Sequence, residues 1–187
     1  MRRHSELAPR HIMVVGVSGI GKSAISRRLS ALGQEAYDIE SLPGLFAWFR
    51  RDTGERFHDI EIGNRESIKQ ARWLCDAAGL SALLARQSRP TAFYCGNASN
   101  NDELVQLFDT LLLLRVSPEE LRRRLAERAH TGEYGNSAEM RDQILSWQDW
   151  YDKTMIGLGA IPVDASGTLE ETVDAILRGW GAEGRQG

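Results

Sequence analysis

Three glycines and a lysine–serine pair lie close together near the start of the chain, as Gly16, Gly19, Gly21, Lys22 and Ser23. Glycine can adopt positive φ and bring its backbone N–H close to an anion, and we expect all three glycines to do so here. A helix that starts directly after them would point its positive end at the same anion. Lys22 would then reach the β- and γ-phosphates of a nucleotide, and the Ser23 hydroxyl would ligate Mg²⁺.

The residues on either side of this loop favour that chemistry. The apolar run IMVV at 12–15 predicts a strand, and residues 22–32 predict a helix that Gly33 can end. A strand, a glycine loop and a helix in this order form the P-loop, the context in which such glycines bind phosphate. We therefore interpret the whole turn, including Ile20 and Ala24, as a nucleotide-binding loop.

Two acidic residues follow the second predicted strand, at 35–39. Asp38 and Glu40 are two positions apart at the carboxyl end of that strand, so both side chains lie on one side. Ligands bind at this end of the strands in an open parallel sheet. One carboxylate can hold Mg²⁺ through water, and the other can orient or deprotonate an attacking hydroxyl. The alternative is a solvated loop.

A short polar loop, CGNASN, begins at the last residue of the third predicted strand, 91–95. Gly96 and Asn97 are candidates to present a backbone N–H and an amide to substrate oxygens. The alternative is a plain turn before a helix that Asn100 caps. We interpret Cys95 as a small core residue rather than a nucleophile.

A basic segment, LRRRLAER at 121–128, is the second group of candidate phosphate ligands. Arg124 and Arg128 are four residues apart and share one face of a helix. Arginine suits this task because its guanidinium is planar, stays charged and binds phosphate with two N–H groups. The alternative is an exposed basic face. Residues 128–137 contain two glycines and mostly polar residues, and we interpret them as a short lid.

The elements that must position these residues alternate along the chain. Strands are predicted at 12–15, 35–39, 91–95, 111–116 and 160–164, and a long helix is predicted from Glu66 to Arg86. Short apolar runs of this kind indicate strands buried on both faces. Strands separated by helices indicate right-handed crossovers, so the fold class is α/β, with a five-stranded parallel sheet and helices on both faces.

Several helix ends are marked in the sequence. Ser117 and Thr168 begin capping boxes, and Ser137 is a further N-cap. Gly157 is expected to end the helix that Ser137 begins.

Size and charge limit the classes of function. A chain of 187 residues with net charge −3 suits one domain at 11–180, with flexible tails at 1–10 and 181–187. A duplex nucleic-acid binder usually carries a strong basic excess, so we expect no such partner. No apolar stretch is long enough to span a membrane. Two cysteines outside any metal-binding spacing indicate a cytoplasmic protein without structural zinc. We expect a monomer or a homodimer.

The loop from Gly16 to Ser23 resembles that of the small P-loop kinases, the adenylate kinase and shikimate kinase group. The resemblance extends from about residue 11 to residue 180 through scattered motifs. It implies a three-layer P-loop kinase fold with a short lid, and the use of ATP and Mg²⁺.

The resemblance also suggests roles for residues on the acceptor side. It implies that Asp38 faces the metal, with Ser23 as its other protein ligand, and that Glu40 faces the acceptor. Shikimate kinases have a second aspartate where this chain has Glu40, so the acceptor need not be shikimate. Residues 41–90 correspond to the acceptor-binding region, where Arg50, Arg51 or Arg65 could pair with an anionic acceptor.

On the nucleotide side, the resemblance places Arg124 over the adenine and Arg128 on the phosphates. It also implies that the loop of Asp164 and Ala165 lines the adenine. Lys22, Asp38, Glu40 and Arg128 are therefore the candidate catalytic residues.

The function predicted from these residues is transfer of the γ-phosphoryl group of ATP to a hydroxyl of a small-molecule acceptor. One alternative is a nucleoside or nucleoside monophosphate kinase. An alternative from another class is a nucleotide-binding switch that hydrolyses ATP slowly. A kinase of RNA ends would require a basic groove, which the composition does not favour.

Overall fold

A central parallel sheet organises the computed structural model, which describes residues 9–127 and 137–180. Its five strands lie in the order β2-β5-β1-β6-β7, and every neighbouring pair is parallel. Their bounds are β1 Arg10–Val15, β2 Glu35–Asp38, β5 Thr91–Cys95, β6 Thr110–Arg115 and β7 Ile161–Asp164. The predicted five-stranded parallel sheet is confirmed.

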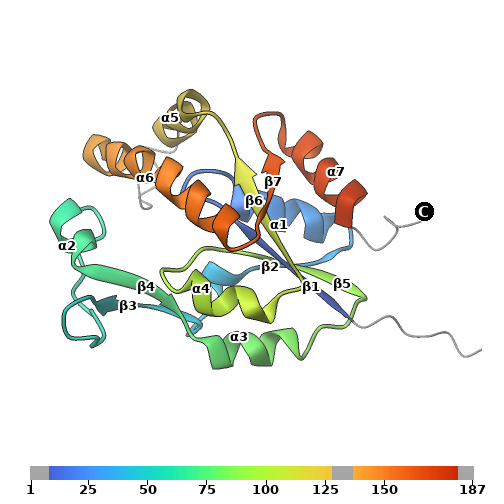
Figure 1. Ribbon diagram of the computed structural model, residues 1–187, viewed down its shortest axis with the longest axis horizontal. Coiled ribbons are helices and arrows are strands. Elements are labelled where there is room, and N and C mark those ends of the chain that lie inside the picture. Colours follow the sequence, from blue (N-terminus) through green and yellow to red (C-terminus); the bar gives the residue numbers. More distant parts are fainter. Residues whose placement is uncertain (1–8, 128–136, 181–187) are drawn as a thin grey trace, which may run out of the picture.

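Helices cover both faces of this sheet (Figure 1). Helices α1 (Lys22–Ala31) and α7 (Leu169–Trp180) pack together on one face. The other face carries α3 (Ala77–Leu84), α4 (Asn101–Leu104), α5 (Pro118–Glu127) and α6 (Ala138–Gly157). Short 3₁₀ turns follow β2 and α4, at η1 (Ile39–Ser41) and η2 (Val105–Leu107). This arrangement brings the loops after all five strands to one edge of the sheet.

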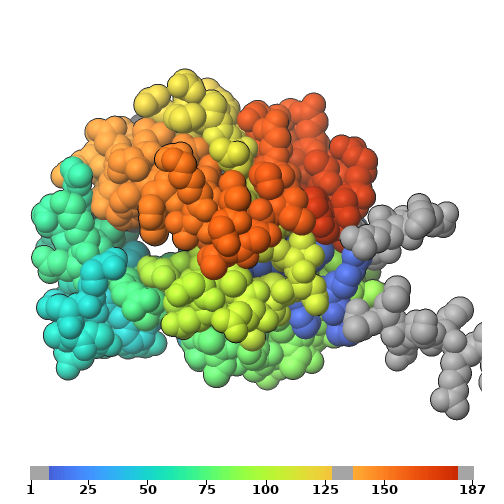
Figure 2. Space-filling view, in the orientation of Figure 1, coloured from blue at the N-terminus to red at the C-terminus, as the bar shows by residue number. Residues whose placement is uncertain are grey.

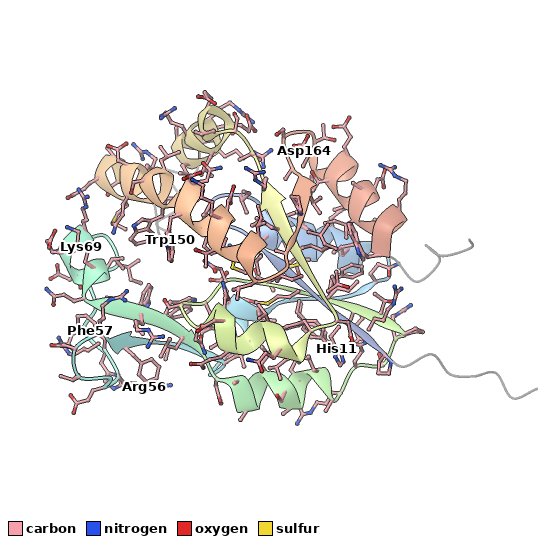
Figure 3. All side chains as sticks on the ribbon, in the orientation of Figure 1. His11, Arg56, Phe57, Lys69, Trp150 and Asp164 are labelled. Atoms are coloured by element: carbon pink, nitrogen blue, oxygen red, sulfur yellow. The ribbon has the colours of Figure 1, made fainter. Side chains whose placement is uncertain are left out.

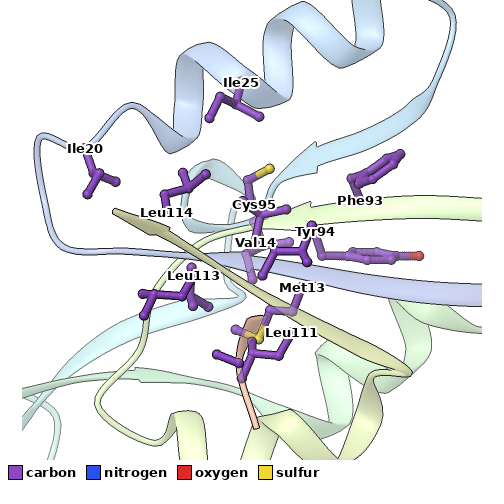
Figure 4. Close-up of a cluster of buried hydrophobic side chains, with 14 of the residues drawn as sticks. Met13, Val14, Ile20, Ile25, Phe93, Tyr94, Cys95, Leu111, Leu113 and Leu114 are labelled. Atoms are coloured by element: carbon purple, nitrogen blue, oxygen red, sulfur yellow. The ribbon is translucent and has the colours of Figure 1, made fainter. Parts of the chain in front are cut away.

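The core lies along the central strands (Figure 4). Residues 12–15 of β1 and 112–114 of β6 are at most 1% exposed, and all of β5 is buried. Strands covered on both faces must be apolar on both faces, which explains why their sequences are continuous apolar runs.

The predicted helix starts are confirmed. Ser137 accepts a hydrogen bond from the N–H of Met140, and Thr168 and Glu171 bond to each other's backbone N–H groups. Ser117 accepts from the N–H of Glu120. At the other end of α6, Gly157 is the last helical residue, but the left-handed turn is made two residues later by Gly159, at φ 91°.

The prediction of one helix from Glu66 to Arg86 is wrong. This segment contains α2 (Arg65–Lys69), β4 (Ala71–Cys75) and α3. Asn64 and Asp76 each accept hydrogen bonds from the N–H groups of a new helix start, which divides the segment into two helices. Between them, β4 pairs antiparallel with β3 (Phe46–Arg50), an element that the sequence did not indicate. We call β3 and β4 together the hairpin.

Asn100 also differs from its predicted role. It occupies the N-cap position of α4 but makes no capping hydrogen bond with its side chain. Its amide instead accepts from the N–H of Cys75 and donates to the carbonyl of Cys75, both at 3.1 Å. Asn100 therefore acts as a strand partner for the free edge of β4 and ties the hairpin to the sheet.

Some expectations fall on residues that the structure does not describe. These are the tails at 1–8 and 181–187, and the lid at 128–136 together with Arg128. Among the described residues, no helix combines the length and apolarity required to cross a membrane.

Candidate functional site

The loop between β1 and α1 has the geometry of an anion site. Gly19 and Gly21 have φ of 86° and 116°, a region that favours glycine. Gly21 is the N-cap of α1 and provides no side-chain cap, so the first N–H groups of the helix, including those of Ser23 and Ala24, stay available. Unpaired N–H groups at a helix start attract anions.

Gly16 is glycine for a different reason from the predicted one. Its φ is not positive. A Cβ atom there would lie 2.8 Å from Cγ2 of Ile20, so the loop could not fold back over the strand. The expectation of positive φ is therefore wrong for Gly16 and confirmed for Gly19 and Gly21.

Lys22 joins this loop to the acidic segment after β2. Its ammonium donates to the carbonyl of Gly16 at 2.9 Å, and it lies 3.6 Å from Oε1 of Glu40. The Lys22 side chain is 10% exposed and that of Glu40 is 31% exposed. The candidate phosphate ligand and the candidate acceptor ligand therefore meet at one point.

Glu40 is held from a second side by the hairpin. The indole N–H of Trp73, on β4, donates to Oε2 of Glu40 at 3.1 Å. Gly96 makes room for this segment, because a Cβ on Gly96 would lie 2.9 Å from Cδ1 of Ile39 and 3.3 Å from Cγ of Glu40. The N–H of Gly96 donates to Val14 within the sheet, so it is not the free donor that the sequence suggested.

Asn97 belongs to a small buried network next to Glu40. Its Oδ1 accepts from the hydroxyl of Tyr151 at 2.9 Å and from the amide of Asn101 at 2.8 Å. Burial, with the charge of Glu40 as a second cause, raises the pKa of Tyr151, so its hydroxyl remains a donor. Tyr151 thereby connects α6 to the acceptor side of the site.

A cavity of about 140 Å³ lies beside the loop, between α1 and the segment after β7. Ile20, Ala24, Arg124 and Ala165 contribute to its lining. The Arg124 guanidinium donates to the carbonyls of Ile20 at 3.0 Å and Ala165 at 2.7 Å. Arg124 therefore joins α5, the loop and the β7 segment around one cavity, where the resemblance to P-loop kinases implies the adenine.

The remaining predicted site residues differ in their exposure and in the contacts that they make. Asp164, labelled in Figure 3, is exposed, and hydrogen bonds from the side chain and the backbone N–H of Ser166 lower its pKa. Asp38 lies at the end of β2, half-buried. Ser23 is exposed at the second position of α1. Arg65 is exposed at the first residue of α2, and the described contacts do not join it to Glu40.

Two residues of the site had not been found from the sequence. Trp73 was assigned to a helix, and its role depends on the register of the hairpin. Tyr151 was placed correctly in a helix, but its contact with Asn97 spans 54 positions. A hint existed in both cases, since a large aromatic side chain with a polar group usually finds a hydrogen-bond partner when buried.

A second cavity, of about 410 Å³, lies at the hairpin, where Ala47, Phe49 and Leu74 contribute to its lining. Ala47 pairs with Leu74, while Trp48 pairs with Trp73 on the opposite face of the pleat. Ala47, Phe49 and Leu74 therefore point away from Glu40, whereas Phe46, which also lines this cavity, stacks on Trp73. We assign the Trp73 face of the hairpin, and not this cavity, to the site.

No protein-family model and no curated protein matches the sequence. Solved structures do match in fold. A gluconokinase from Sinorhizobium meliloti 1021 is 21% identical, with 91% of each chain covered and a TM-score of 0.50. A shikimate kinase from Bacteroides thetaiotaomicron is 17% identical, with 90% of this chain and 96% of that chain covered and a TM-score of 0.52. TT1252 from Thermus thermophilus is 17% identical, with 91% and 95% covered and a TM-score of 0.58.

These similarities define the class of fold. The chain has the three-layer α/β fold of the P-loop kinases, which confirms the predicted fold class. Sequence identity is too low for the similarity to identify a substrate.

Proposed function

We propose that the protein is an ATP- and Mg²⁺-dependent kinase that transfers the γ-phosphoryl group to a hydroxyl of a small-molecule acceptor. The observation that carries this proposal is the 3.6 Å approach of Lys22 to Glu40. Lys22 is suited to bind the phosphates of ATP, and Glu40 is suited to accept a proton from the acceptor. Because the two side chains lie close together, the phosphoryl donor and the acceptor would meet beside them.

Each residue has a role in this proposal. The N–H groups at the start of α1 and the ammonium of Lys22 bind the phosphates of ATP. Arg124 and Ala165 line the cavity that receives the adenine. Glu40 orients the acceptor hydroxyl and takes its proton. Catalysis of phosphoryl transfer depends mainly on such positioning and charge stabilisation.

The described residues fit Mg²⁺ bound chiefly by phosphate. They contain no group of three or more His, Cys, Asp or Glu side chains able to hold a metal alone. Mg²⁺ usually keeps several waters and takes one or two protein ligands beside the phosphates of its nucleotide. The Ser23 hydroxyl and the Asp38 carboxylate would supply these ligands, and the ion would neutralise charge on the phosphates.

The test is ADP release from Mg-ATP by the full chain, with and without a pool of hydroxyl metabolites, nucleosides and nucleoside monophosphates. Products are identified by mass spectrometry. We expect ADP release that depends on the acceptor, with one compound gaining a phosphoryl group. Lys22→Ala should abolish turnover while the circular dichroism spectrum stays unchanged. Slow ADP release that no acceptor changes would contradict the proposal and favour a nucleotide-dependent switch.

A further inference from the structure

The hairpin presents an aromatic face on the side of Glu40. Side chains that are paired across antiparallel strands point to the same face, so Trp48 and Trp73 lie together. Their ring centroids are 4.9 Å apart, and Phe46 stacks on Trp73 at 5.3 Å. Because the Trp73 N–H bonds to Glu40, this aromatic face begins at the candidate base.

A further tryptophan, Trp147, lies on α6, the helix that also carries Tyr151. Trp147 is one turn of α6 from Gln143 and one turn from Tyr151, which are 3% and 8% exposed, yet Trp147 is 41% exposed. Residues four apart share a face of a helix. A tryptophan between two buried residues on one face is accessible only if that face borders an open space.

Figure 2 shows a hollow between α2 and β4 on one side and α6 and α4 on the other. In the view of Figure 3, Trp150, which is 66% exposed, projects from α6 toward β4. Trp150 of α6 and the aromatic face of the hairpin therefore lie on opposite sides of the hollow.

The polar side chains at this hollow are largely occupied with one another. Asn101 accepts from the N–H of Ala98 and donates to Asn97, and Tyr151 donates to Asn97. Ser99 accepts from the N–H of Trp73. These side chains are therefore held by contacts within the protein.

Two arginines that were candidates to bind an anionic acceptor are also engaged. Arg51 donates to the carbonyls of Lys69 and Ala71, both at 3.2 Å. The guanidinium carbon of Arg50 lies 4.0 Å from the centroid of the Phe57 ring. Both side chains therefore contact the hairpin or the residues beside it.

We propose that the acceptor is a hydroxyl-bearing compound with a planar aromatic ring, of the nucleoside class. Its ring lies between the aromatic face of the hairpin and Trp147, and its hydroxyl lies at Glu40. This inference rests on the proposed kinase function. Stacking on aromatic side chains stabilises a planar ring without requiring many hydrogen bonds.

The reaction balances in this arrangement. The acceptor oxygen forms a bond to the γ-phosphorus of ATP, and the bond from that phosphorus to the β–γ bridging oxygen breaks. The hydroxyl proton passes to the Glu40 carboxylate, and ADP leaves with the electron pair of the broken bond. The products are a phosphate monoester and ADP.

The first experiment compares three groups of acceptors with the full chain and Mg-ATP: nucleosides, nucleoside monophosphates, and sugars with sugar acids. We expect only nucleosides to gain a phosphoryl group. Phosphorylation of a sugar, a sugar acid or a nucleoside monophosphate would overturn this inference and leave the kinase function intact. ADP release with no phosphorylated product in any group would remove the kinase function itself.

The second experiment locates the ring. Trp147→Ala should raise the KM for the nucleoside about tenfold or more, because a stacking partner is lost, and leave the KM for ATP unchanged. It should also weaken the quenching of tryptophan fluorescence by the nucleoside alone. The matched control is Trp180→Ala, at the end of α7 on the other face of the sheet. Equal effects of the two substitutions would overturn the assignment of Trp147 to the acceptor site.

Discussion

At the scale of single residues, the two contacts of the Lys22 ammonium are central to the site. Its ammonium is bound to the Gly16 carbonyl and paired with Glu40. The phosphates of a nucleotide would compete with Glu40 for this ammonium. Nucleotide binding would therefore free the carboxylate at the moment when it is needed to receive an acceptor.

Substitution of Glu40 tests this competition. Glu40→Gln should lower kcat by about 100-fold or more, which is the usual contribution of a general base. ATP should bind as tightly as before, or more tightly, because Lys22 no longer has an anionic partner to leave. Isothermal titration with a non-hydrolysable ATP analogue measures this affinity. If ATP affinity and kcat fell together, Glu40 would belong to the metal site or to the structure of the loop.

Trp73 should position Glu40 through its indole N–H. Trp73→Phe keeps a ring on the hairpin but removes the donor to Oε2. A hydrogen bond to a partly exposed carboxylate should cost about 3- to 10-fold in kcat when lost, with little change in the KM for ATP. Trp48→Phe is the control, since no hydrogen bond among the described residues involves the Trp48 indole N–H. A similar kcat in the two variants would mean that only the aromatic surface matters.

At the scale of elements, the hairpin depends on one side chain. Asn100 is 4% exposed and pairs with both backbone groups of Cys75. Asn100→Ala would leave a buried N–H and carbonyl unpaired, so we expect a loss of about 2 kcal/mol or more in the free energy of unfolding. The KM for the acceptor should also rise, because the hairpin carries Trp73.

Thermal and urea unfolding measure this effect against Asn64→Ala. Asn64 caps the short, exposed helix α2, so its loss should cost about 1 kcal/mol or less. Equal destabilisation by the two substitutions would show that Asn100 contributes no more than an ordinary helix cap.

The elements also explain which parts of the molecule could be predicted from sequence. Strands β1, β5 and β6 are buried on both faces, so their apolar runs stand out locally, and the helix caps at Ser137 and Thr168 are local as well. The hairpin could not be predicted, because Phe46 pairs with Cys75 across 29 positions and β4 is only partly buried. The loop from Gly16 to Ser23 could be predicted from its sequence motif, whereas the contacts of Trp73 and Tyr151 depend on how distant elements pack.

At the scale of the whole molecule, two buried thiols should make the free energy of unfolding fall as the pH rises into the alkaline range. Burial raises the pKa of Cys75 and of Cys95 to about 12, against about 9 for a free thiol. The folded state therefore retains these protons while the unfolded state loses them. Their contribution is complete below about pH 9 and is lost as the pH rises toward 12.

Urea unfolding at several values between about pH 8 and pH 10.5 measures this dependence. Above the thiol pKa of the unfolded chain, the free energy of unfolding should fall by about 1.4 kcal/mol per pH unit for each thiol. The double variant Cys75→Ala, Cys95→Ala should show a shallower fall. Parallel curves for the two proteins would mean that the thiols ionise equally in both states.

The order of the strands has a consequence for how the protein is made. The central strand β1 leaves the ribosome first, but its neighbours β5 and β6 are translated much later. The cavity beside the phosphate loop is completed only by Ala165, Gly167, Leu169 and Thr172. When only the phosphate-binding loop has left the ribosome, the growing chain can bind a nucleotide through its amide groups but has no enclosed pocket for it. Nucleotide capture should therefore begin late in translation, after β7 and the start of α7 have emerged and packed on the sheet.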